Sequence, residues 1–138
     1  MKNFLDLDKT LICRSDIKFI EIDIDKLSIT VFTDYDYFCF RYKTEKELNN
    51  EVDYITTTSM YGYSCDLYRL SSKYLINLTK LTAIEFSKEP INSKEVWVAY
   101  ITWNVDKKED DFNDKYVLDE GLEDEYLEEI IEEILDRS

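Results

Sequence analysis

The segment 17-IKFIEIDIDKLSITVFT-33 decides the fold, because its side chains alternate between apolar and polar with a turn in the middle. In residues 20–24 every second side chain is apolar, which is the period of a strand with one buried face. Residues 25–26 interrupt the alternation, and it resumes at 27–33. The pattern therefore predicts two antiparallel strands joined by a short turn.

The neighbouring sequence extends this pair into a meander. A short strand is predicted at 4–13, and another, rich in strand-forming aromatic residues, at 37–42. Thr44 and Glu47 then have the spacing of a capping box, and the helix that follows carries apolar residues on one face. Residues 1–55 are thus predicted to form antiparallel strands closed by a helix.

The second half of the chain repeats this order. A polar, tyrosine-rich linker is expected at 56–72, and a second unit of strands and a helix at 73–138. The segment 5-LDLDK-9 is echoed by 76-INLTK-80, which suggests an internal pseudo-repeat. The predicted fold class is α+β: two tandem antiparallel β-meander-plus-helix units in one compact domain, ending in an acidic amphipathic helix.

The pair Asp6 and Asp8 in 6-DLDKT-10 resembles the first motif of haloacid-dehalogenase-type phosphotransferases. That resemblance implies a nucleophilic Asp and an acid/base Asp beside Mg²⁺. Such enzymes place the motif between a buried parallel strand and a helix. Here strands follow instead, and the echoed segment carries Asn77 and Thr79 at the equivalent positions. We therefore expect the pair to be structural.

The composition excludes most of the enzyme classes that can be recognised from sequence. There is no histidine, the commonest general base, and two glycines cannot build a phosphate-binding loop. Cys13, Cys39 and Cys65 lack metal-ligand spacing, and the acidic loop 106–114 lacks the Gly and Glu of an EF-hand. With no apolar leader or membrane-spanning run, we expect a cytoplasmic protein without enzyme activity, cofactor or metal ion.

Negative charge is concentrated at the C-terminal end. Of the net charge of −14, residues 1–108 contribute 17 acidic and 15 basic side chains, a net of −2. Residues 109–138 contribute 14 acidic and 2 basic side chains, a net of −12. Such a polyanion repels phosphate, so direct binding to nucleic acid is not expected.

An amphipathic helix is predicted from residue 122 to about 135. Its apolar residues recur at helical spacing and form one stripe, which predicts packing against a sheet: Leu122, Tyr126, Leu127, Ile130, Ile131, Ile134 and Leu135. The other positions are almost all carboxylates without lysine partners four residues away. With two acids of the preceding loop, the candidate partner-binding residues are Glu123, Asp124, Glu125, Glu128, Glu129, Glu132, Glu133, Asp136, Asp110 and Asp111.

The spacing of these carboxylates approaches that of nucleic acid. At a rise of about 1.5 Å per residue, the eight helical carboxylates span roughly 20 Å, or about one charge per 2.5–3 Å. One DNA strand carries a phosphate about every 3.4 Å. A rigid array of this kind could occupy the basic channel of a nucleic-acid-binding protein, although a solvated, solubilising surface is the alternative.

In size, composition and its acidic C-terminal helix the chain resembles small acidic inhibitors of phages and mobile elements, such as DNA-mimic anti-restriction and anti-CRISPR proteins. The resemblance implies a non-enzymatic inhibitor of a CRISPR effector, restriction enzyme or nuclease inside a host bacterial cell, and it transfers no functional residues. An immunity protein against a nuclease toxin would have the same surface. A phage structural or assembly protein that uses Trp97, Trp103 and the tyrosines is a third interpretation, and exposed strand edges could pair in a homodimer.

Overall fold

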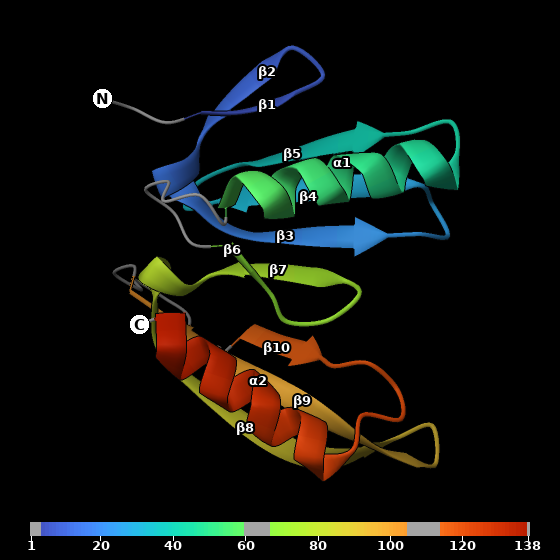
Figure 1. The fold of residues 1–138 in the computed structure, drawn as a ribbon, viewed down its shortest axis with the longest axis vertical. Helices are drawn as coiled ribbons and strands as arrows, with labels where there is room; N and C mark the ends of the chain where they lie inside the picture. The colour runs from blue at the N-terminus through green and yellow to red at the C-terminus, as the bar shows by residue number, and fades with distance from the viewer. Residues whose placement is uncertain (1–3, 60–66, 105–113, 138) are drawn as a thin grey trace. The chain divides into compact units, whose positions relative to one another are not determined.

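The protein is a mixed α+β structure. The computed structural model describes residues 4–59, 67–104 and 114–137. In these residues ten strands form three antiparallel sheets, accompanied by two α-helices, which confirms the predicted fold class (Figure 1). Contacts divide the chain into a first unit, residues 1–69 and 73–79, and a second unit, residues 70–72 and 80–138. Neither of the helices in the described residues has the length and apolarity needed to span a bilayer.

The first unit begins with a hairpin where the sequence predicted one strand. β1 (Phe4–Leu7) and β2 (Thr10–Cys13) pair antiparallel. Asp8 and Lys9 between them have φ values of 46° and 64°. Two consecutive left-handed residues form the turn whose twist matches that of the flanking strands, and aspartate tolerates this conformation. The segment 6-DLDKT-10 is therefore a hairpin turn.

A five-stranded sheet forms the centre of the first unit. β3 (Ile17–Asp23) and β4 (Ser28–Thr33) pair as predicted, and β5 (Tyr37–Arg41) extends the meander. β7 (Tyr74–Asn77) pairs with the free edge of β3, and β6 (Leu67–Arg69) pairs with β7. The strand order is therefore β5-β4-β3-β7-β6.

The position of β6 and β7 differs from the boundaries that the sequence suggested. β6 lies inside the expected linker at 56–72, and β7 lies at the start of the expected second unit, yet both belong to the first sheet. Leu75 of β7 lies opposite Ile20 of β3, and both are fully buried. An apolar strand is equally able to begin a new unit or to complete an old one, and only this long-range pairing shows which occurs.

Helix α1 (Glu45–Ser59) follows the meander and begins as predicted. The Glu47 N–H donates to Thr44 Oγ1 at 3.1 Å, while the Glu47 carboxylate accepts from the Lys43 N–H at 3.2 Å, one residue earlier than in the usual box. The helix continues past residue 55, where the linker was expected. Thr56 accommodates helical backbone there by donating its hydroxyl to the Val52 carbonyl at 3.0 Å.

One apolar core holds the first unit together. The inward side of α1, the sheet and the hairpin all contribute to it, and Figure 1 shows α1 running along the sheet. Burying such side chains is the main favourable contribution to folding, at about 1.5–3 kcal/mol for each large aliphatic residue. The fully buried members are Leu5, Leu7, Ile17, Ile20, Ile29, Val31, Leu48, Ile55 and Leu75.

The second unit is a three-stranded sheet with a helix. β8 (Leu81–Ile91), β9 (Lys94–Trp103) and β10 (Asp114–Val117) have the order β10-β9-β8. β8 and β9 are joined by a turn at Asn92 and Ser93, which both have positive φ. Proline fits within β8 because that strand pairs on one side alone. Helix α2 (Asp124–Arg137) follows β10 (Figure 1).

A short piece of chain between β6 and β7 also belongs to the second unit. The Ser72 N–H donates to both carboxylate oxygens of Asp119, at 3.1 and 3.2 Å, and the Ser72 hydroxyl donates to Oδ1 at 2.6 Å. Leu70 and Ser71 beside it are buried. Asp119 therefore holds residues 70–72 in the second unit, although these residues lie between two strands of the first.

The two echoed segments adopt different local structures. Residues 5–9 form the end of β1 and a hairpin turn, whereas residues 76–80 form the end of β7 and a 3₁₀ turn at Leu78–Lys80. Their shared apolar alternation therefore reflects the period of a strand. The two segments do not form equivalent structural elements.

Asn77 at the end of β7 is the most enclosed polar side chain in this part of the sheet. It is 0% exposed, its amide donates to the Ile17 carbonyl at 2.7 Å, and its oxygen accepts from the Thr79 N–H and hydroxyl at 3.0 and 2.7 Å. Both the nitrogen and the oxygen of the Asn77 amide thus have hydrogen-bond partners. The pattern links β7 to the start of β3, beyond the last backbone pair of the two strands.

We predict that Asn77→Ala lowers the free energy of unfolding by about 1–3 kcal/mol, because it leaves buried polar groups without a hydrogen-bond partner. Asn77→Asp should cost more at pH 7, since it places a carboxylate against the Ile17 carbonyl. The buried carboxyl would have a raised pKa, so its charged-state penalty should shrink as the pH falls toward 4. Urea unfolding at both pH values measures these differences. An Asp variant no less stable than the Ala variant at pH 7 would contradict this role.

Candidate functional site

The C-terminal helix α2 starts two residues later than the sequence suggested. Gly121 has a φ of 77°, a conformation that glycine adopts at no steric cost, and the Leu122 N–H bonds to the Asp119 carbonyl across this turn. The Glu123 carbonyl accepts from the N–H groups of Tyr126 and Leu127, at 3.0 and 3.1 Å. Residues 119–122 are therefore a turn, and Glu123 is the residue at which helical bonding begins.

The apolar stripe of α2 is only partly covered. Leu127 is buried, while Leu122, Ile130, Ile131 and Ile134 are half-buried. Tyr126 and Leu135, predicted as part of one continuous buried stripe, are 54% and 65% exposed. At about 100° per residue both lie on the flanks of the helix relative to Leu127, so they project beyond the contact. The buried part of the stripe is therefore narrower than the sequence predicted.

The carboxylates of α2 all reach solvent. Four of them follow one another at i, i+4, i+7 and i+11 and lie on the side of the helix opposite Leu127. We call these four the acidic face: Glu125, Glu129, Glu132 and Asp136, all exposed. Glu128 and Glu133 flank this surface and are exposed too, as is Glu123 just before the helix. Asp110 and Asp111, which the sequence added to the candidate set, lie outside the described residues.

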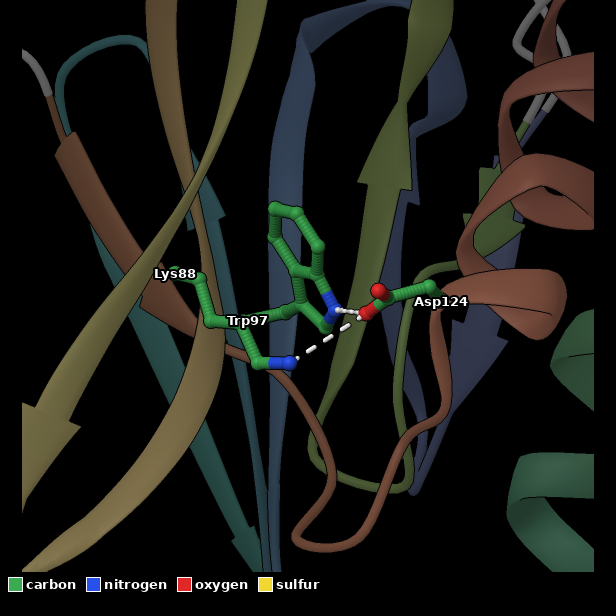
Figure 2. Close-up of polar contacts among 3 residues, drawn as sticks. All are labelled: Lys88, Trp97 and Asp124. Atoms are coloured by element: carbon green, nitrogen blue, oxygen red, sulfur yellow. Dashed lines mark hydrogen bonds and ion pairs between the residues drawn. The ribbon is translucent and has the colours of Figure 1, made fainter.

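Asp124 has a different role from the other carboxylates. Its Oδ1 accepts from the Trp97 indole N–H at 3.1 Å and from the Lys88 ammonium at 3.3 Å. Lys88 and Trp97 are opposite each other on β8 and β9, and the Lys88 nitrogen lies 5.7 Å from the Trp97 ring centroid. Figure 2 shows the three side chains converging at the first residue of α2. Asp124 therefore fixes the start of the helix to the sheet, where a negative charge also complements the helix dipole.

Two further lysines of the second unit, Lys115 and Lys94, engage carboxylates that lie outside the acidic face. Lys115 lies 3.3 Å from Glu89, and Lys94 lies 3.5 Å from Glu120. The Tyr100 hydroxyl donates to Glu89 as well, and this hydrogen bond, together with Lys115, lowers the pKa of Glu89 below its usual value. In return, Glu89 raises the pKa of Lys115. Lys115 is one of two basic residues after position 108, and its charge is directed at the sheet.

The aromatic residues of the second unit mostly pack and donate within the sheet. The Trp103 indole N–H and the Tyr116 hydroxyl both donate to the Asp114 carboxylate, and the two rings meet edge to face at 6.3 Å. Trp103 and Tyr116 are both buried. In the first unit, by contrast, Tyr35 is 90% exposed. Tyr61 and Tyr63 of the expected linker lie outside the described residues.

Asp6 and Asp8 lie beside acidic and phenolic groups of the first unit. Burial, followed by the charges of Asp6 and Asp8, raises the pKa of Glu51 above its usual value. Burial, followed by Glu51 and Asp8, raises the pKa of Tyr42. Within residues 4–59, 67–104 and 114–137, no group of three or more His, Cys, Asp or Glu side chains is arranged to hold a metal ion. The pair thus lies in a hairpin with antiparallel neighbours, a different setting from that of the phosphotransferase motif.

We predict that Asp124→Ala lowers the free energy of unfolding by about 1 kcal/mol, through loss of the Trp97 hydrogen bond and the favourable dipole contact. The emission of Trp97 should shift to longer wavelength as the helix start frays, with Trp97→Phe identifying its signal. Asp124→Asn keeps an acceptor oxygen, so its free energy of unfolding should fall less. Equal losses in the two variants would mean that charge, and not the indole bond, anchors the helix.

Glu51 should make stability depend on pH in a specific direction. A carboxyl with a raised folded pKa favours the folded state below its unfolded pKa, and that contribution is lost as the pH rises through the folded value. Glu51→Gln is therefore expected to raise the melting temperature at pH 7 and to change it little near pH 4. Asp53→Asn on the exposed side of the same helix is the matched control. A gain of equal size at both pH values would rule out this electrostatic cause.

Comparison with known proteins gives one distant structural likeness. No protein-family model matches the sequence, and no curated protein matches it. Among solved structures, the chain is similar to the LytTr DNA-binding domain of a methyl-accepting/DNA response regulator from Bacillus cereus. The two share 12% identity with a TM-score of 0.49, over 97% of this chain and 95% of that domain. At this distance the likeness carries nothing about function from that domain to this chain.

Proposed function

We propose that the protein is a non-enzymatic inhibitor that binds a basic nucleic-acid-binding protein through the acidic face of α2. The observation that supports this most is the exposure of Glu125, Glu129, Glu132 and Asp136 along the side of the helix opposite its buried contact. The partner class is a nuclease, a restriction enzyme or a CRISPR effector. Its arginine and lysine side chains would bind these carboxylates in place of phosphates.

The helical framework suits such a role. The acidic face runs along a regular helix whose start is held by Asp124, Trp97 and Lys88. Carboxylates fixed on a helix need less ordering on binding than the same groups on a flexible tail. The dense negative charge would also accelerate association with a basic partner and make binding weaken with salt.

The arrangement carries a cost in stability. Like charges four residues apart, such as Glu125 with Glu129 and Glu132 with Asp136, each destabilise a helix by about 0.2–0.5 kcal/mol. Acids near the end of a helix also oppose its dipole, and Asp136 is the penultimate residue of α2. Interspersed lysines would remove this cost, so the lack of lysine among these acids favours a binding role over a merely solubilising one.

The test compares three immobilised proteins exposed to bacterial lysate. They are the wild type, an acidic-face variant (E125Q, E129Q, E132Q, D136N) and a control variant (D25N, D53N, E85Q, E95Q) that neutralises four exposed acids elsewhere. We expect the wild type and the control to retain the same basic protein, which duplex DNA or rising salt releases. The acidic-face variant should fail to retain it, and with purified partner its affinity should be at least about a hundredfold weaker.

A folding check and the identity of the partner complete this test. Circular dichroism should give the three proteins equal helix content, and removal of like charges should raise the melting temperature of the acidic-face variant. A retained toxin nuclease would indicate an immunity protein, and a retained defence nuclease an anti-defence inhibitor. If all three proteins retain the same partner equally, the acidic face is a solvated surface and the proposal fails.

A further inference from the structure

A cavity of about 370 Å³ opens in the first unit between the β1–β2 hairpin and the turn that joins β4 to β5. Its walls come from residues 11–13 and Phe4 of the hairpin and from residues 33–36 and Phe38, and Asp16 lines it too. The volume lies at the lower end of the range of ligand pockets, which is about 300–1,000 Å³. It is separate in sequence from the acidic face of α2.

The lining combines carboxylates with exposed aromatic and aliphatic surface. Among the described residues, the charged side chains that line the cavity are Asp16, Asp34 and Asp36, and none of the lining residues is basic. Around them, Leu11 is 62% and Tyr35 is 90% exposed. Apolar side chains this exposed are usually retained at binding surfaces when they gather in a patch. The lining therefore suits a ligand that is positively charged at one end and apolar along its length.

The turn on one side of the cavity has a defined conformation. The Thr33 N–H and hydroxyl both donate to the Asp36 carbonyl, at 2.8 and 3.1 Å, and the Asp36 N–H donates back to Thr33 Oγ1 at 3.0 Å. These bonds involve backbone and hydroxyl groups and leave the Asp36 carboxylate exposed. The turn thus holds Tyr35 and the Asp36 carboxylate at the rim without using either for its own closure.

We propose that this cavity binds an arginine side chain presented by a segment of a partner protein. A guanidinium group can stack on the ring of Tyr35 or Phe38 while it donates to the Asp16 or Asp36 carboxylate. The aliphatic stem of the arginine would cover the apolar wall formed by Leu11 and Phe4. Lysine fits less well, because its compact, strongly hydrated ammonium stacks poorly on aromatic faces and makes no bidentate contact.

Titration of the ¹⁵N-labelled full-length protein with a blocked Ala-Ala-Arg-Ala-Ala peptide tests this inference by residue-resolved NMR. Saturable shifts are expected for amides in 11–16 and 33–38. The same peptide with citrulline, a neutral isostere of arginine, should give affinity at least about tenfold weaker, because a charge-assisted hydrogen bond is lost. The protein variant D16N/D36N should lose a similar factor in affinity, and D25N/D53N, which removes two exposed carboxylates of the same unit outside the cavity lining, should lose none.

A second variant keeps the test decisive if D16N/D36N disturbs the fold. Tyr35→Ala removes a side chain that is 90% exposed, so the NMR spectrum should remain that of the folded protein while arginine binding weakens. Equal binding of the arginine and citrulline peptides would overturn the proposal, as would shifts that are confined to α2 and grow without saturation. Neither result bears on the acidic face, whose test relies on different residues and a different partner measurement.

Discussion

The pairing of β3 with β7 is the interaction on which the first unit depends. The three-stranded meander of β3, β4 and β5 forms from neighbouring residues, but its β3 edge stays open until β7 returns from beyond α1. The pairing places Leu75 opposite Ile20 in the core and brings Asn77 to the Ile17 carbonyl. Closing so long a loop costs chain entropy, and buried contacts with matched polar groups offset that cost.

The second unit shows how a sheet can carry a strongly acidic helix. Three of its lysines are directed to acids of the sheet, of the turn and of the first helical position, in the pairs Lys115–Glu89, Lys94–Glu120 and Lys88–Asp124. The helix is attached through Leu127 and half-buried isoleucines on one side and through Asp124 at its start. The charge segregation visible in the sequence thus persists in three dimensions, where the acidic face lies on the side away from the apolar contact.

Local patterns in the sequence predicted local structure well. Alternation at 17–33 predicted β3 and β4, the Thr44–Glu47 spacing predicted the start of α1, and the apolar spacing after residue 122 predicted α2. The exposure of the helical carboxylates followed from the same spacing. Each of these features depends on residues within one or two turns of one another, which is the range over which period and capping act.

The features that sequence reasoning missed depend on conformation or on distant partners. The hairpin at Asp8 and Lys9 requires two left-handed residues, which glycine or asparagine would have signalled more strongly. Residues 74–77 were expected to begin the second unit, but β7 pairs with β3, because an apolar strand does not encode its partner. Asp124 looked like any other carboxylate of the helix, and its role depends on Trp97, a residue of another element. The cavity beside Tyr35 likewise combines residues of a hairpin, a turn and a strand.

The placement of residues 70–72 has a consequence for how this protein can evolve. The chain leaves the first unit at Leu70, returns to it at Lys73 and leaves it again at Lys80, with Ser72 held by Asp119 of the second unit. No single break in the gene separates the two units intact. A recombination event after residue 69 deprives the first sheet of β7, and one after residue 79 deprives Asp119 of Ser72. The two units are therefore expected to be inherited and exchanged together, and not shuffled as independent modules.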